Sequence, residues 1–220
     1  MNNNDFAPLS AVEDHKKGLQ EIWLCNHTIT KISHEIQLIR NLKVVALTNN
    51  SIESFPKEIC GLKYLERLLL GRNKITTLPP EITALQRLRE LRLNDNQLQL
   101  FPVDLTMIPS IRRLSLANNA ITTLPPEIRR FVNIHDLDMD GNSIGPTLAE
   151  PVQKSLISLN RTLRILGLAH NFFTREPECI SKMIKLHVFR FHGNRAKDFV
   201  VKDELTVSSC QAHEVSKVHR

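Results

Sequence analysis

The sequence of 220 residues predicts an α/β solenoid, a stack of eight coils that each contain one short strand and one outer turn. Three observations support this fold class: a recurring pattern "L-x-x-L-x-L-x-x-N", a constant step of 23 residues, and a proline–acid segment after many of the patterns. The patterns start at Leu19, Leu42, Leu65, Leu88, Ile111, Ile134, Leu163 and Leu186. Every step is 23 residues except the one from Ile134 to Leu163, which is 29.

The first part of each coil is predicted to be a short strand with one buried face. In the block that starts at Leu65, Leu68 and Leu70 are two residues apart and therefore share one face of a strand, whereas Arg67 and Leu69 fall on the other. The later apolar residues of the block fold the chain back over the buried face. We therefore expect the fourth residues of the central blocks to point inward: Leu68, Leu91, Leu114 and Leu137.

An asparagine ladder is predicted at the ninth position of the blocks. A turn buried inside a stack needs partners for its backbone groups, and an asparagine amide offers both donors and an acceptor. The first block has His27 at this position. The other seven have Asn50, Asn73, Asn96, Asn119, Asn142, Asn171 and Asn194.

The outer turn of each coil is predicted from a proline–acid segment, for example Leu78–Ile82 and Leu124–Ile128. Proline is tolerated at the start of a helix, and a carboxylate there interacts well with the helix dipole. We expect a single helical turn, of the 3-10 type, and a structural role for its acids. These acids all occupy the seventeenth position: Glu35, Glu58, Glu81, Asp104 and Glu127.

The sixth block, 134–162, is longer by six residues, and its return segment is predicted to form a true helix. Val152, Leu156 and Leu159 recur there at helical spacing, which indicates two to three turns. Two interpretations stay open: an insertion tolerated on the outer surface, or a second contact site.

The two ends of the chain are expected to differ from the solenoid of 19–199. Residues 1–18 precede the first block, and 11–17 are predicted to form a short helix that caps the open core. The apolar residues 199–201 are expected to add one more layer to the core, and 200–220 is expected to be a flexible tail.

The two "L-P-P-E-I" segments, at Leu78–Ile82 and Leu124–Ile128, resemble the signature of intracellular leucine-rich repeat proteins of the Ras group. The resemblance implies a curved right-handed coil, with a parallel β-sheet on the concave face and short helical or 3-10 turns on the convex face. It also implies a non-catalytic protein–protein interaction module, a scaffold or regulator in intracellular signal transduction. Implied partners are proteins, such as components of small-GTPase pathways or phosphatases.

Composition and charge narrow the expected partners and compartment. The net charge of +6 and pI of about 9.3 come from cations dispersed among 23 acids, so we expect no nucleic-acid partner. No apolar stretch approaches the ~18 residues of a membrane span, and the first residues show no secretory signal. The four cysteines show neither close pairing nor zinc spacing. We expect a monomer in the cytoplasm.

Candidate partner-binding residues lie on the strand face that points away from the core, where packing does not fix their identity. A tryptophan is expected to be exposed at the N-terminal end beside Ala46. Further along, we expect a basic centre of Arg67, Arg72, Arg92 and Arg113 and an acidic strip of Asp136, Asp138 and Asp140. The alternative is that these charges only solvate the sheet and pair across strands. The predicted binding residues are Trp23, Arg67, Leu69, Arg72, Glu90, Arg92, Arg113, Asp136, Asp138, Asp140, Arg190 and His192.

No catalytic residue, metal site or cofactor is predicted. Alternate aspartates on a strand lie ~6.6 Å apart, which does not supply the six or more oxygens of a calcium site. His170 and His192 are expected to be near neighbours, as an incidental pair. Two other functions stay open: a targeting subunit of a phosphatase or cytoskeletal motor, and an effector ligase fragment that lacks its catalytic domain.

Overall fold

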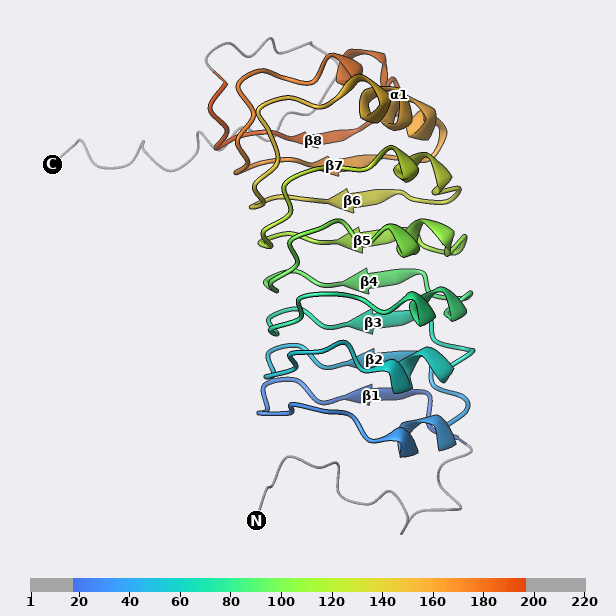
Figure 1. Cartoon of the computed structure of the whole chain (residues 1–220). Helices are drawn as coiled ribbons and strands as arrows, with labels where there is room; N and C mark the ends of the chain where they lie inside the picture. The colour runs from blue at the N-terminus through green and yellow to red at the C-terminus, as the bar shows by residue number, and fades with distance from the viewer. Residues whose placement is uncertain (1–17, 197–220) are drawn as a thin grey trace, which may run out of the picture.

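Eight parallel strands form one sheet in the computed structural model, which describes residues 18–196 (Figure 1). The strands pair in chain order, β1 with β2 and so on to β8, so that each strand is hydrogen-bonded only to its neighbours. The strands are β1 (Glu21–Trp23), β2 (Val44–Ala46), β3 (Arg67–Leu69), β4 (Glu90–Arg92), β5 (Arg113–Ser115), β6 (Asp136–Asp138), β7 (Ile165–Gly167) and β8 (Val188–Arg190). This confirms the predicted solenoid.

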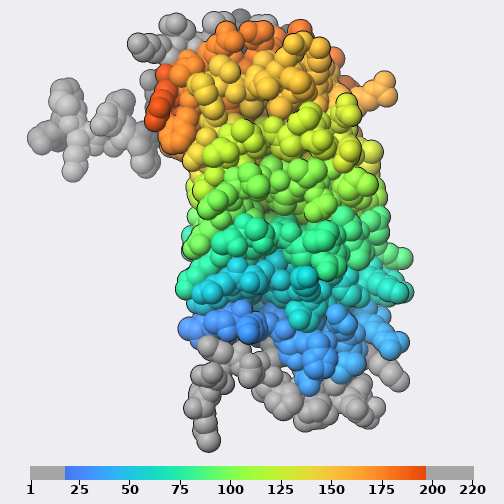
Figure 2. All heavy atoms as spheres, viewed as in Figure 1, coloured from blue at the N-terminus to red at the C-terminus, as the bar shows by residue number. Residues whose placement is uncertain are grey.

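The strand register also agrees with the prediction. Leu68 of β3 is opposite Leu91 of β4, which is opposite Leu114 of β5, and all are buried. Because side chains alternate across a strand, the residues on either side of each leucine point away from the core, to the concave face of the sheet. Figure 2 shows the coils in contact along the whole stack, so the core runs from end to end.

The outer turns are 3-10 turns, as expected, and each buries an apolar residue against the core. All of them except η2, which Ser33 caps, begin with a proline–acid segment, and the acids lie in the first turn, where the helix dipole favours negative charge. The turns are η2 (His34–Leu38), η3 (Lys57–Gly61), η4 (Pro80–Ala84), η5 (Val103–Met107), η6 (Pro126–Arg130) and η8 (Glu178–Lys182).

The asparagine ladder is confirmed in every block that has the residue. The side chain of Asn96 shows the bonding: its Oδ1 accepts from the N–H of Ile75 at 2.9 Å, and its Nδ2 donates to the carbonyls of Leu70 and Leu93 at 3.0 and 3.1 Å. One amide thus connects the turn of its own coil to the coil before. His27, which replaces asparagine in the first block, is exposed.

The long sixth block contains the predicted helix, α1 (Glu150–Ser158), followed by the 3-10 turn η7 (Leu159–Arg161). Val152, Leu156 and Leu159 are buried, which confirms the helical spacing. The Ser155 hydroxyl donates to the carbonyl of Pro126 at 2.8 Å and so fastens α1 to η6. The helix lies on the same side of the stack as the outer turns (Figure 1).

A column of left-handed residues runs along the ends of the strands, and the sequence interpretation missed it. The eighth residue of every block has a positive φ, between 51° and 72°. Asparagine, aspartate and glycine tolerate this conformation, whereas other residues are strained by it. The column is Asn26, Asn49, Arg72, Asp95, Asn118, Gly141, His170 and Gly193. Arg72 is therefore held in a costly conformation, whereas histidine, as at His170, adopts it more readily.

The buried thiols are expected to be unreactive. Burial raises the pKa of Cys60 and Cys179 to about 11, and nearby glutamates add to the effect. At pH 8 such a thiol is only about 0.1% thiolate, the nucleophilic form. We expect iodoacetamide to label half-buried Cys25 in the folded protein, and Cys60 and Cys179 only after unfolding. Peptide mass spectrometry measures this, and equal rates for the three thiols would contradict it.

The predicted N-terminal cap at 11–17, the apolar layer at 199–201 and the tail from 200 lie outside the described residues. Within 18–196, no helix has the length and apolar character needed to cross a bilayer.

Candidate functional site: the concave sheet face

Trp23 is exposed at the N-terminal edge of the sheet, as predicted, with 54% of its surface accessible. Its indole N–H donates to Glu21 Oε2 at 2.9 Å. Ala46 and Leu69 follow it in the same row of the sheet, but both are buried. The expectation that Leu69 is exposed for binding is wrong, because it lies in this row between small Ala46 and long neighbours such as Arg92. Of these three apolar residues, Trp23 alone is exposed.

The basic centre forms around one buried carboxylate. Glu90 of β4 is only 2% exposed, so its predicted role as a contact residue is also wrong. Its Oε2 is 3.2 Å from both Arg67 Nε and Arg113 Nη2, and its Oε1 is 2.8 Å from Arg92 Nε. The three arginines come from three adjacent strands; Arg92 and Arg113 remain exposed, and Arg67 is half-buried. Glu90 therefore holds them in place and leaves the group with a surplus of positive charge.

Arg72, the fourth arginine predicted for this centre, lies elsewhere. It belongs to the left-handed column after β3, and its nearest acid is Asp95, with Nε and Oδ2 4.0 Å apart. Asp95 in turn accepts from Asn94 Nδ2 at 2.7 Å and from Asn118 Nδ2 at 2.9 Å. Arg72 thus extends the polar surface along the edge of the sheet.

Two aspartates of the acidic strip, Asp138 and Asp140, form ion pairs with an arginine two strands away. Arg113, its register neighbour, turns to Glu90 instead. Arg190 of β8 reaches across β7 and places Nη2 2.8 Å from Asp138 Oδ1 and Nε 2.5 Å from Asp140 Oδ2. It can do so because Gly167 of β7 has no side chain, and a Cβ there would overlap Arg190 and both aspartates. The sequence predicts which residues share the concave face, but it does not predict that Arg190 reaches over β7 to these aspartates.

Asp136 is the least satisfied group on this face. Its Oδ1 is buried and has no hydrogen-bond partner among the described residues. Burial raises the pKa of Asp136, and the charge of Asp138 raises it further, against the opposing effect of Arg190, Arg113 and Arg92. Burial also raises the pKa of Asp140, although its bond to Arg190 opposes the change. The negative charge of Asp136 therefore lowers the stability of the folded protein.

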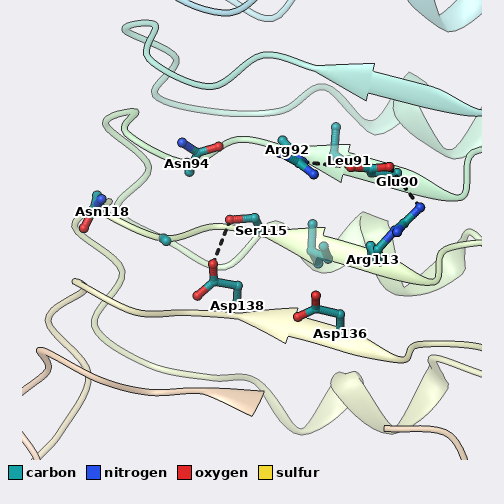
Figure 3. A pocket seen from close by; sticks show the side chains of 11 residues that line it. Glu90, Leu91, Arg92, Asn94, Arg113, Ser115, Asn118, Asp136 and Asp138 are labelled. Atoms are coloured by element: carbon teal, nitrogen blue, oxygen red, sulfur yellow. Dashed lines mark hydrogen bonds and ion pairs between the residues drawn. The ribbon is translucent and has the colours of Figure 1, made fainter. Parts of the chain in front are cut away.

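A hollow of about 400 Å³ opens on the concave face over β4, β5 and β6 (Figure 3). Arg92 and Arg113 line one side, Asp136 and Asp138 line the other, and Ser115 between them donates to Asp138 Oδ2 at 3.2 Å. The arrangement can accept a cationic group against the aspartates and an anionic group against the arginines. A polar segment of another molecule suits this surface better than an apolar ligand.

His170 and His192 are in contact, as expected, with ring centroids 4.8 Å apart in an edge-to-face arrangement. His192 is half-buried on the concave side, and its Nδ1 has no hydrogen-bond partner among the described residues. Within 18–196, no group of three or more histidine, cysteine or acidic residues is placed to hold a metal ion.

Asp136→Asn is expected to raise the melting temperature at neutral pH. Because the pKa of Asp136 is raised above its ordinary 3.8, the folded state binds more protons than the unfolded state as the pH rises. The contribution of Asp136 to the free energy of unfolding is therefore most favourable at low pH and is lost as the pH rises through the pKa of Asp136 in the folded protein. The gain of Asp136→Asn should vanish below pH 3.8.

Thermal melts of both proteins across this pH range measure the effect. Asp104→Asn, on the exposed start of η5, is the matched control and should give no gain. A lower melting temperature for Asp136→Asn at neutral pH would contradict the prediction.

Two family models match the sequence, both described as leucine-rich repeats, at residues 40–98 and 110–131. The matched segments cover the coils whose sheet, ladder and outer turns are described above. The chain is a leucine-rich repeat protein. Such repeats are generally protein-binding modules, typically without catalytic activity, and their curved stacks offer extended concave surfaces.

Solved structures support the same fold. A leucine-rich repeat protein of Leptospira interrogans aligns with a TM-score of 0.75 and 32% identity, over 82% of this chain and 44% of its own. An internalin from Listeria monocytogenes gives 0.64 and 18%, over 77% and 46%. The plant peptide hormone receptor RGFR1, solved in complex with RGF2, gives 0.62 and 25%, over 80% and 31%.

This leucine-rich repeat chain thus spans less than half the length of each of these three structures. A search of curated proteins gives no significant match. Because 421 solved chains share the fold at a significant level, the fold by itself does not select a partner.

Proposed function

We propose that this leucine-rich repeat protein is a non-catalytic module that binds a protein partner on its concave sheet face. The observation that supports this most is the hollow over β4–β6, where two arginines oppose two aspartates. We further propose a role as scaffold or regulator in intracellular signalling, in line with the two "L-P-P-E-I" segments that resemble the Ras group.

The arginines of the hollow are prepared for binding. Arg92 and Arg113 are both fixed by Glu90, so little side-chain freedom is lost when a partner carboxylate contacts them. Their guanidinium groups remain more than half exposed and can still donate to such a group. Arginine is also among the residues that contribute most at protein interfaces.

Asp136 supplies the complementary half of the proposed contact. Its unpartnered Oδ1 and raised pKa mean that the carboxylate is costly in the free protein. A lysine or arginine of the partner, placed beside this half-buried carboxylate, would stabilise its negative charge and offset that cost. The partner should therefore present a cationic and an anionic side chain close together, and Trp23 offers an apolar contact further along the face.

Asp136→Asn provides the sharpest test, because it should increase stability and weaken binding at the same time. Reversing Arg92 and Arg113 would be less informative, since Glu90 would then lose two of its counterions inside the sheet. The full chain is used to capture proteins from an extract of its source cells, and captured proteins are quantified against the same experiment with the variant.

The control carries Arg129→Glu and Arg130→Glu on the outer turn η6, away from the concave face. We expect a specific partner to be reduced with Asp136→Asn and retained with the control, and then to be confirmed by titration of the purified pair. Loss with the outer variant, together with unchanged binding of Asp136→Asn, would overturn the concave-face assignment. The identity of the captured protein tests the proposed signalling role separately.

A further inference from the structure

Positive charge is concentrated on one side of the solenoid, apart from the concave face. The four residues that precede each of the strands β2–β8, from Arg40–Lys43 to Ile184–His187, form what we call the start flank. The start flank holds nine lysines and arginines and one acid, Glu66. The rest of 18–196 holds 14 lysines and arginines against 15 acids. The net positive charge of the described chain therefore lies entirely on this flank.

The start flank is a continuous surface. The last residues of successive four-residue segments are bonded through their backbones: Arg112 N–H donates to the carbonyl of Arg89 at 2.9 Å, and Arg164 N–H to that of His135 at 2.8 Å. Their side chains therefore follow one another at the strand spacing of ~4.8 Å. All eight arrowheads in Figure 1 point left, so the start flank runs along the right-hand side of the stack.

Little of this charge is neutralised. Among the described residues, the one ion pair within the start flank joins Arg89 Nη1 to Glu66 Oε2 at 3.3 Å. Most of the remaining cations, such as Lys43, Arg112 and Lys185, are exposed to solvent, whereas Arg164 is half-buried. This differs from the concave face, where three arginines share Glu90 and Arg190 pairs with two aspartates. A broad and unpaired cationic surface fits an extended anionic surface better than a single charged group.

Exposed apolar side chains stand among these cations. Ile184 is 81% exposed, and Val132 and Tyr64 are also exposed, all in the first two positions of their segments. A single-stranded nucleic acid gains affinity from free aromatic faces that stack its bases, but the ring of Tyr64 is covered by the Arg87 guanidinium at 4.7 Å. Isolated apolar side chains among lysines and arginines instead suit the headgroup region of a lipid bilayer.

We propose that the start flank binds the surface of an anionic membrane. The cations lie against the lipid headgroups, and Ile184 and Val132 enter the boundary of the acyl chains. The concave face, which is formed by other residues of each coil, stays open to a protein partner. The proposal does not depend on that partner, and membrane binding can be measured without it.

The test is co-sedimentation of the full chain with vesicles at about 0.1 M salt. Vesicles of phosphatidylcholine with phosphatidylserine should bind the protein, vesicles of phosphatidylcholine alone should not, and added salt should weaken binding. The triple variant Lys43→Gln, Arg112→Gln, Lys185→Gln should bind about 100-fold more weakly, since each cation near such a surface contributes about fivefold. Ile184→Ser should also weaken binding to the phosphatidylserine vesicles.

The matched control removes three exposed cations elsewhere, with Lys31→Gln, Lys74→Gln and Arg129→Gln, and should keep most of the binding. Circular dichroism verifies that both triple variants are folded. Equal losses in the two triple variants would overturn the proposal, because net charge alone would then explain binding. Absence of phosphatidylserine-dependent binding would also overturn it, as would tighter binding to polyuridylate or polyglutamate, which would indicate a nucleic acid or an acidic protein.

Discussion

Leu91→Ala is expected to lower the free energy of unfolding by about 2–5 kcal/mol. Leu91 lies in the middle of the sheet on β4, is fully buried, and is in register with Leu68 and Leu114 of the adjacent strands. Truncation removes apolar contacts with both neighbouring coils and leaves a cavity that a rigid stack cannot close. Urea unfolding of the variant and of the natural chain measures the difference.

Leu100→Ala is the matched control, because it removes the same atoms from a residue that is 74% exposed. We expect it to change the unfolding free energy by no more than about 0.5 kcal/mol. A loss below about 1 kcal/mol for Leu91→Ala would contradict the packing of the coils.

Asn96→Ala is expected to lower the free energy of unfolding about as much as Leu91→Ala does, although it removes no apolar group. The change leaves the N–H of Ile75 and the carbonyls of Leu70 and Leu93 without their side-chain partner inside the stack. Each buried polar group left unpaired costs about 1–3 kcal/mol. Both the unfolding free energy and amide hydrogen exchange at Ile75 should report the loss.

Asn133→Ala is the control for the ladder. Asn133 is exposed, and its Nδ2 donates only to the carbonyl of Pro109 at 2.9 Å. Its removal should cost less than about 1 kcal/mol, because water can replace the side chain. Equal effects of the two substitutions would show that the ladder adds nothing beyond an ordinary surface hydrogen bond.

The fold could be predicted from the sequence because periodicity decides which residues point inward. Leu68 and Leu69 are chemically identical neighbours, yet only Leu68 is at the fourth position, which is apolar in every block and therefore belongs to the core. The spacing of 23 residues then fixes the parallel register, since the same positions must meet in adjacent coils. The longer block could be predicted for the same reason, because its added apolar residues follow helical spacing.

The exposure and the partners of each residue on the concave face could not be predicted in this way. Its exposure depends on the length of side chains in neighbouring coils, so Glu90 became buried beneath three arginines. The reach of Arg190 depends on a missing side chain at Gly167, which involves three strands at once. The left-handed column did leave a signal, in the asparagine and glycine residues at the eighth position, but Arg72 and His170 interrupt it.

The strictly sequential strand order also determines how the molecule comes apart. Because each strand is hydrogen-bonded only to its neighbours, an end coil can detach while the next one stays folded, and unfolding can advance inward from either end. The hollow lies over β4–β6, so three coils protect it on one side and two on the other. A molecule that has lost coils from its N-terminal end would therefore still present this surface, whereas loss of β8 would remove Arg190 from Asp138.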